Sequence, residues 1–120
     1  MRYYVKALKN YANFNGRASR KEFWMFQLFL LIIYVVAVLL DITFGTFSED
    51  LGVGLLSAGV SLFHILPSLS LTVRRLHDID KDGWFLLFLL IPIVGPILLL
   101  IWMLTPGTPG ENRFGPQPAD

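Results

Sequence analysis

The sequence contains no cysteine, and few of its 120 residues are charged. The absence of cysteine excludes disulfide bonds, thiolate metal ligands and cysteine nucleophiles. Lys, Arg, Asp and Glu together make up only 16% of the chain, and the formal net charge is +1. A nucleic-acid-binding protein would carry a large, clustered surplus of Lys and Arg. We therefore expect no nucleic-acid partner.

Sequence motifs typical of enzyme active sites are also missing. The chain has no glycine-rich phosphate-binding loop, no Gly-x-Ser-x-Gly nucleophile elbow and no His-Glu-x-x-His zinc motif. His77 and Asp78 are adjacent, but a metal site needs three or four converging ligands. We therefore expect no catalytic residue, no metal and no cofactor, and we predict that the protein is not an enzyme.

Long apolar stretches are what the sequence has in abundance, because 54% of its residues are hydrophobic. Residues 23–40 contain no charge and are apolar on all sides, whereas a helix of a soluble bundle needs a polar face. This stretch also exceeds the apolar run of a signal peptide, and no cleavage site follows it. The sequence predicts a single all-α membrane domain over residues 1–120 with three transmembrane helices, at residues 19–41, 49–75 and 82–104.

The distribution of charge predicts the orientation of these spans. Six Lys and Arg residues precede the apolar stretch 23–40, whereas the loop at 41–50 carries only acidic charges. Arg74 and Arg75 follow the second span. By the positive-inside rule, the N-terminus is cytoplasmic and the irregular tail at 105–120 lies outside.

Two prolines in the third apolar stretch leave an alternative open. Pro92 and Pro96 interrupt the stretch, and a helix-breaking bend there would turn it back toward the side from which it came. The tail would then lie inside, with Arg113 near Arg74.

The segment before the first span is amphipathic. Tyr4, Leu8 and Tyr11 fall on one side of a helix, so residues 1–16 are predicted to form a short interfacial helix on the cytoplasmic leaflet. The alternative is a helix that packs on the cytoplasmic loop. Ser19 and Glu22 have the spacing of a capping box, which predicts the start of the first span, and Ser48 is predicted to cap the second.

Polar residues recur along one face of the second span. Steps of three and four residues place them in one stripe, which must avoid lipid. Such a stripe either permits close helix packing with hydrogen bonds across it or lines a path for water or protons. The second possibility would make the protein a small oligomeric transporter or channel. The stripe comprises Ser57, Ser61, His64 and Ser68.

Three segments together resemble a known family. Residues 16–24, residues 74–84 and residues 107–115 occur in this order around three apolar stretches, as in the YhaH-like family of small bacterial inner-membrane proteins, a domain of unknown function. The resemblance implies a multi-pass location in the bacterial inner (plasma) membrane and a compact three-span fold. It implies no activity, substrate or catalytic residue.

The charge gathered beside the spans predicts where the protein acts. We expect a non-enzymatic protein that associates with membrane lipid headgroups, with other membrane proteins or with itself through a cytoplasmic cluster. The cluster comprises Arg17, Arg20, Glu22, Trp24, Arg74, Arg75, His77, Asp78 and Trp84. A less regular motif in the tail, predicted to form an ordered turn, comprises Asn112, Arg113 and Gly115.

Overall fold

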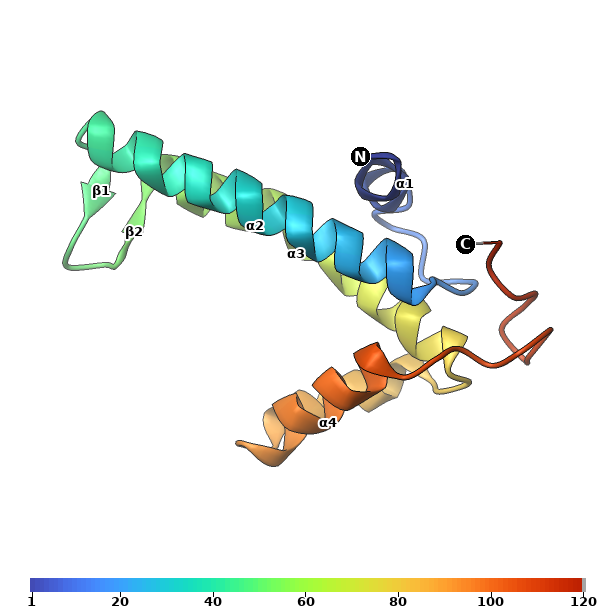
Figure 1. Ribbon diagram of the computed structural model, residues 1–120. Coiled ribbons are helices and arrows are strands. Elements are labelled where there is room, and N and C mark those ends of the chain that lie inside the picture. Colours follow the sequence, from blue (N-terminus) through green and yellow to red (C-terminus); the bar gives the residue numbers. More distant parts are fainter. Residues whose placement is uncertain (120) are drawn as a thin grey trace.

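A computed structural model describes residues 1–119 and is mostly helical (Figure 1). Two long helices, α2 (Arg20–Thr43) and α3 (Leu55–Asp78), run side by side in opposite directions. Each has 24 residues, or about 36 Å, against about 30 Å for the hydrocarbon core of a bilayer. Both are apolar enough to cross a membrane, and the prediction of two candidate spans in these regions is confirmed.

A short β-hairpin joins the two long helices at the end farthest from the N-terminus. Its strands, β1 (Phe47–Ser48) and β2 (Val53–Gly54), are antiparallel. The prediction that the second span begins at residue 49 under a Ser48 cap is wrong, because Ser48 lies in β1 and α3 begins at Leu55.

Asp41, in the last turn of α2, supplies the missing cap. Its carboxylate accepts hydrogen bonds from the backbone N–H groups of Leu56 and Ser57, both at 2.9 Å. The first N–H groups of a helix have no partner within the helix, so the Asp41 carboxylate supplies one at the positive end of α3. A side chain at Gly54 would overlap Asp41, which explains the glycine at this close approach. One acidic residue therefore fixes how the two long helices meet.

The third apolar stretch is a helical hairpin instead of the predicted continuous span over 82–104. It consists of a 3-10 helix, η1 (Gly83–Leu90), and an α-helix, α4 (Val94–Leu104). Within residues 1–119, only α2 and α3 pass the length and hydropathy test for a span. In Figure 1 the hairpin diverges from the α2–α3 pair, and its base lies near the C-terminal end of α3.

The chain reverses at Pro92 and Ile93 for physical reasons. Pro92 disfavours a helical conformation at the residue before it, and Ile91 is extended. The Val94 N–H donates to the Pro92 carbonyl at 2.7 Å, which closes a γ-turn with Ile93 at a φ of 69°. Pro96 falls in the first turn of α4, where its missing N–H costs nothing.

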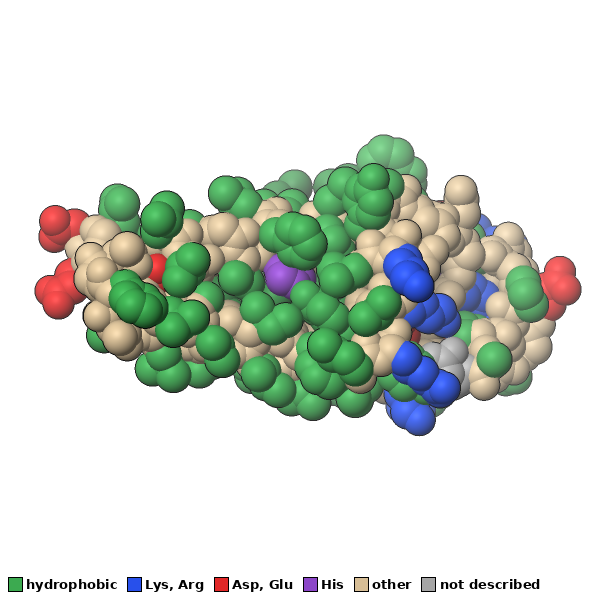
Figure 2. Space-filling model, turned by 90° about the horizontal axis from the view of Figure 1, so that it is seen from above, with side chains coloured by type: hydrophobic (Ala, Val, Ile, Leu, Met, Phe, Trp, Pro, Cys, Tyr) green, Lys and Arg blue, Asp and Glu red, His purple; other side chains and the backbone are tan. Residues whose placement is uncertain are grey.

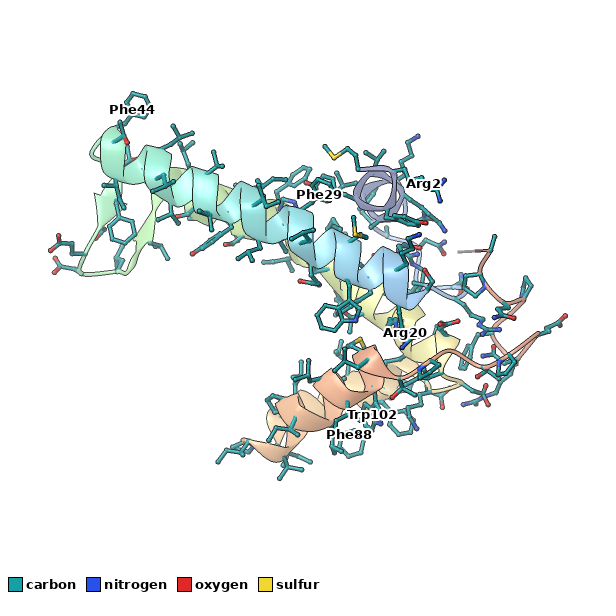
Figure 3. All side chains as sticks on the ribbon, viewed as in Figure 1. Arg2, Arg20, Phe29, Phe44, Phe88 and Trp102 are labelled. Carbon is teal, nitrogen blue, oxygen red and sulfur yellow. The ribbon has the colours of Figure 1, made fainter. Side chains whose placement is uncertain are left out.

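Aromatic side chains hold the two arms of the hairpin together. Phe85 and Phe88 on η1 both meet Trp102 on α4 edge-on, with ring centroids 5.6 Å apart in each pair (Figure 3). Gly95 lies so close to the Phe88 carbonyl that a side chain there would overlap it. The sequence motif Gly95-Pro96 thus serves close packing as well as the turn.

The N-terminal helix, α1 (Arg2–Lys9), crosses α2 and is seen end-on in Figure 1. Tyr3, Tyr4 and Ala7 are buried, and the Tyr4 ring stacks on Phe26 of α2 with centroids 5.5 Å apart. The prediction of a short N-terminal helix is confirmed, although it ends at Lys9 instead of residue 16. Its buried face packs on α2 and α3, and not on the cytoplasmic loop that the alternative interpretation expected.

Candidate functional site

The most densely bonded group in the protein is the guanidinium of Arg17, at the end of the molecule where α2 begins and α3 ends. Its Nε donates to Asp78 Oδ1 at 3.0 Å, and Nη2 lies 2.9 Å from the same oxygen. The remaining donors reach the backbone carbonyls of Thr108, Gly110 and Gly115 in the tail. Arg17 therefore ties the N-terminal segment to α3 and to the tail at once.

Asp78 is shared between two arginines. Its Oδ2 accepts from Arg75 Nη1 at 2.8 Å, while Oδ1 binds Arg17. Arg75 is fully buried and also donates to the carbonyl of Thr105, just after α4. The Asp78 carbonyl accepts from the Thr108 N–H at 2.7 Å. The end of α3 is thereby fastened to the chain on both sides of the site.

Glu22 forms the second buried ion pair. Its Oε2 lies 2.9 Å from Arg74 Nη1, and Lys6 Nζ lies 3.3 Å from Oε1. The Ser19 hydroxyl accepts from the Glu22 N–H at 3.1 Å, as the predicted capping box requires. The Glu22 carboxylate, however, is directed to Arg74 on α3, so it joins two helices as well as marking the start of one.

The predicted tail motif forms a turn beside this cluster. Asn112 and Gly115 pair through both backbone bonds at 3.1 Å, and Asn112 Nδ2 donates to the His77 carbonyl at 2.9 Å. The His77 ring stacks on Phe114 with centroids 4.0 Å apart, and its Nδ1 lies 2.9 Å from the Gly16 carbonyl. Arg113 pairs with the exposed Asp80 at 3.1 Å. The tail lies at the same end of the molecule as the N-terminal segment.

Cations exceed anions within this buried cluster. Three buried guanidinium groups, those of Arg17, Arg74 and Arg75, face two buried carboxylates, those of Glu22 and Asp78. Backbone carbonyl oxygens compensate part of the surplus by accepting hydrogen bonds. Within residues 1–119, Arg74 Nε and Nη2 find no acceptor. The cluster is therefore a positively charged joint, and its arginines contact other protein groups instead of open surface.

A groove of about 620 Å³ opens beside this joint, between the start of α2 and the end of α4. Arg20 and Lys21 line it and are exposed, and Arg20 Nη1 donates to the Leu104 carbonyl at 3.0 Å. Trp24 lines it too, and its Nε1 donates to the Met103 carbonyl at 3.1 Å. Figure 3 places Arg20 between α2 and α4. The groove thus has charged side chains at its edge and an aromatic ring toward the apolar helices.

The predicted polar stripe on α3 is divided among different partners. Ser57 binds Gly54 and Asp41 at the far end, whereas Ser61 and Ser68 line a groove of about 440 Å³ between α2 and α3. His64 also borders this groove, but both of its ring nitrogens are occupied. Nδ1 lies 2.7 Å from the Val60 carbonyl and Nε2 lies 2.7 Å from the hydroxyl of Tyr4.

The structure therefore gathers most predicted site residues but separates others. Arg17, Glu22, Arg74, Arg75, His77 and Asp78 form the buried joint, and Arg20 and Trp24 line the adjacent groove. Trp84 is 78% exposed at the base of the hairpin, outside the joint. Sequence reasoning missed Tyr4, whose pKa is raised by burial and whose hydroxyl anchors α1 to α3. It also missed the tail carbonyls, since a backbone acceptor leaves no sequence signal.

Comparison with known proteins gives the chain its relatives. The family model described as "Protein of unknown function (DUF805)" matches residues 11–116. Inner membrane protein YhaH of Escherichia coli (strain K12) is 44% identical over 118 residues, covering 98% of this chain and 97% of the relative. Inner membrane protein YhaI of the same strain is 40% identical over 118 residues, covering 98% and 96%. No solved structure matches. The family model and the two relatives confirm the resemblance that the three sequence segments indicated.

Proposed function

The chain belongs to the DUF805 family, and on this premise we propose that it acts in the inner membrane without catalysis, by holding anionic phospholipid headgroups at its basic end. The names of its relatives and its two apolar helices support the membrane location. The proposal concerns what the protein does there.

The observation that carries the proposal is the separation of exposed charge along the long helices. Figure 2 shows Lys and Arg side chains gathered toward one end, where an acidic side chain is also visible, and only acidic charged side chains at the opposite end. Glu49 and Asp50 are the exposed acidic residues of the β-hairpin. Each basic side chain near an anionic leaflet is worth about 1 kcal/mol of attraction. The exposed cations of α1 and of the start of α2 are Arg2, Lys6, Lys9, Arg20 and Lys21, and Arg113 of the tail is a further exposed cation at the same end.

The groove beside the joint suits a phospholipid in particular. Arg20 and Lys21 offer donors to a phosphate at the N-terminus of α2, where the helix dipole is positive. Trp24 and Leu104 continue the groove toward the apolar helices, which suits the glycerol and upper acyl region. Asp78 also lines the groove, but its carboxylate is already paired with two arginines.

The same charge separation supports a revised topology. The basic end belongs in the cytoplasm by the positive-inside rule. The tail lies at that end, bonded to Arg17, so we place both termini in the cytoplasm. This replaces the expectation that residues 105–120 lie outside, and it agrees with the alternative in which Pro92 and Pro96 turn the third stretch back.

Lipid selectivity can be measured through quenching of Trp24 fluorescence. A chain with Trp84→Phe and Trp102→Phe keeps only the tryptophan that lines the groove, and reconstitution with brominated lipids reports which lipid lies beside it. We expect brominated phosphatidylglycerol to quench more than brominated phosphatidylcholine. Arg20→Gln with Lys21→Gln should abolish the difference.

The matched control is Arg113→Gln, which removes an exposed cation at the same end. Arg113 is paired with Asp80 and Asp82, so its loss should leave the lipid preference unchanged. Equal quenching by both lipids in the parent chain would refute the proposed headgroup binding.

Transport by an oligomer is a second candidate, favoured by one observation. The groove between α2 and α3 places Gln27, Tyr34, Ser61 and Ser68 at membrane depth, where polar groups need partners. Ion flux into proteoliposomes containing the parent or His64→Ala tests it. Background flux in both would exclude conduction, whereas flux that His64→Ala abolishes would favour it over lipid binding.

A further inference from the structure

The protein is much broader at its basic end than at its acidic end. The long helices α2 and α3 reach from the β-hairpin to the basic end, whereas α1 and the base of the η1–α4 hairpin lie near the basic end (Figure 1). At the other end the helices carry only the short β-hairpin. The molecule therefore has an asymmetric profile along the direction in which α2 and α3 would cross a bilayer.

The hairpin of η1 and α4 has the length of one leaflet. The 11 residues of α4 span about 16 Å, and the 8 residues of η1 span about 16 Å at the longer 3-10 rise. Half of a hydrocarbon core is about 15 Å. A hairpin of this length, with its base at the basic end and inclined to the α2–α3 pair, would stay within the leaflet at that end.

The surface of the hairpin is suited to lipid along its length. Its tip is apolar, with Leu90 79% exposed and Ile93 77% exposed, and neither arm contains a charged residue. Trp84 stands exposed at the base, where a bilayer interface accommodates an indole. Immediately beyond the base come Asp80, Lys81 and Asp82, which belong in water. Both ends of the hairpin are thus polar and its turn is apolar.

We propose that the hairpin, together with α1, makes the protein a wedge that occupies more area in the leaflet at its basic end, so that the protein favours membranes in which that leaflet is convex. The partner is the lipid bilayer itself, distinguished by its curvature. A convex leaflet has more area at its headgroups, and inserting three extra helical segments there relieves that strain. The inference depends on the hairpin's depth and is independent of headgroup charge.

The test uses tubes pulled from giant vesicles of neutral phosphatidylcholine, so failure of anionic headgroup binding would not affect it. Because the chain lacks cysteine, Glu49→Cys gives one fluorescent label on the exposed β-hairpin. A membrane-impermeant quencher outside silences molecules whose Glu49 end faces out, which separates the two orientations. Molecules with the basic end outward should be enriched in the tube, and those with the basic end inward should be depleted.

Ile93→Asp tests whether the hairpin is the cause. Ile93 is exposed, so Asp at this position displaces no packed neighbour, and the substitution should leave the fold intact while keeping the tip out of the acyl chains. Enrichment should disappear. Phe44→Asp, a similar change at the exposed far end of α2, is the matched control and should keep it (Figure 3). Equal density in tube and vesicle for both orientations of the parent would overturn the proposal, as would undiminished enrichment in Ile93→Asp.

Discussion

Arg17 and Asp78, 61 positions apart in the sequence, form a buried ion pair with 2.9 Å between Nη2 and Oδ1. Asp78 is also the only carboxylate bonded to Arg75 within residues 1–119. Two cations therefore depend on one anion. Removing one partner of a buried pair leaves an uncompensated charge, which costs about 3–5 kcal/mol.

We therefore expect Asp78→Ala to lower the free energy of unfolding by about 3–5 kcal/mol, measured by titrating detergent-solubilised protein with sodium dodecyl sulfate. Asp80→Asn is the matched control, because Asp80 forms an exposed pair and Asn also tolerates its φ of 61°. That control should cost less than about 1 kcal/mol. Similar losses in both variants would show that the buried ion pair contributes no more to the free energy of unfolding than the exposed pair does.

Arg17 and Arg74 should respond differently to replacement by lysine. Arg17 uses all three of its nitrogens in directed bonds, and a single ammonium cannot reproduce that fork. Arg17→Lys should cost at least about 2 kcal/mol, since hydrogen bonds to charged groups are worth about 1.5–3 kcal/mol each.

Arg74→Lys should be tolerated better, because Arg74 has one side-chain hydrogen bond, from Nη1 to Glu22. We expect a smaller loss than at Arg17, because a lysine ammonium can keep the single ion pair with Glu22. The same unfolding titration compares the two. A larger loss at Arg74 than at Arg17 would contradict the bonding pattern.

The buried hydroxyl of Tyr4 predicts a pH dependence. Burial raises the pKa of Tyr4 above its ordinary value of 10.0, so the folded protein favours the protonated hydroxyl. Its contribution to stability is complete below about pH 10 and is lost as the pH rises through the pKa in the folded state. The free energy of unfolding should therefore fall above about pH 10, and Tyr4→Phe should reduce that fall.

At neutral pH the same variant should be less stable by about 1–3 kcal/mol, because the buried Nε2 of His64 loses its partner. Tyr3, whose pKa is lowered chiefly by a hydrogen bond from Arg2, is present in both proteins, and its effect cancels in the comparison. An identical pH profile in the two proteins would show that Tyr4 is not shielded from water.

The topology can be checked in cells. A reporter fused after Asp120 should be active in the cytoplasm, because the tail is bonded to Arg17 at the basic end. A single cysteine at Glu49 should react with an impermeant thiol reagent from outside, and a cysteine at Ala119 should not. Periplasmic activity of the reporter would show that the third apolar stretch crosses the membrane after all.

The helices that depend on local pattern were predictable from the sequence. Residues 23–40 are apolar on every side, and that alone indicates a membrane span. The sequence left the hairpin open as an alternative but could not decide it, because prolines such as Pro92 and Pro96 occur in continuous membrane helices as well. What decides the reversal is the packing of Phe85 and Phe88 on Trp102, together with the close approach at Gly95.

The same contrast holds for the site. The sequence predicted that Arg, His and Asp residues gather beside two spans, but it did not predict that these residues are buried. Burial follows from where the tail lies, and the tail is held through backbone carbonyls of Thr105, Thr108 and Gly110. Asp41 was read as a loop charge for a similar reason. Its partners are the backbone N–H groups of Leu56 and Ser57, and backbone N–H groups occur in every sequence, so they leave no signal.

The bonds from Arg17 to the tail also set an order of events during synthesis. The carbonyl of Thr108 is made 91 residues after Arg17, which at 5–20 residues per second is roughly 5 to 18 s. During that interval the guanidinium lacks its acceptors in the tail, and until residue 78 is made it lacks Asp78 as well. The joint can therefore close completely only after the tail has been made, and a chain that ends before Thr108 lacks the acceptors that complete it.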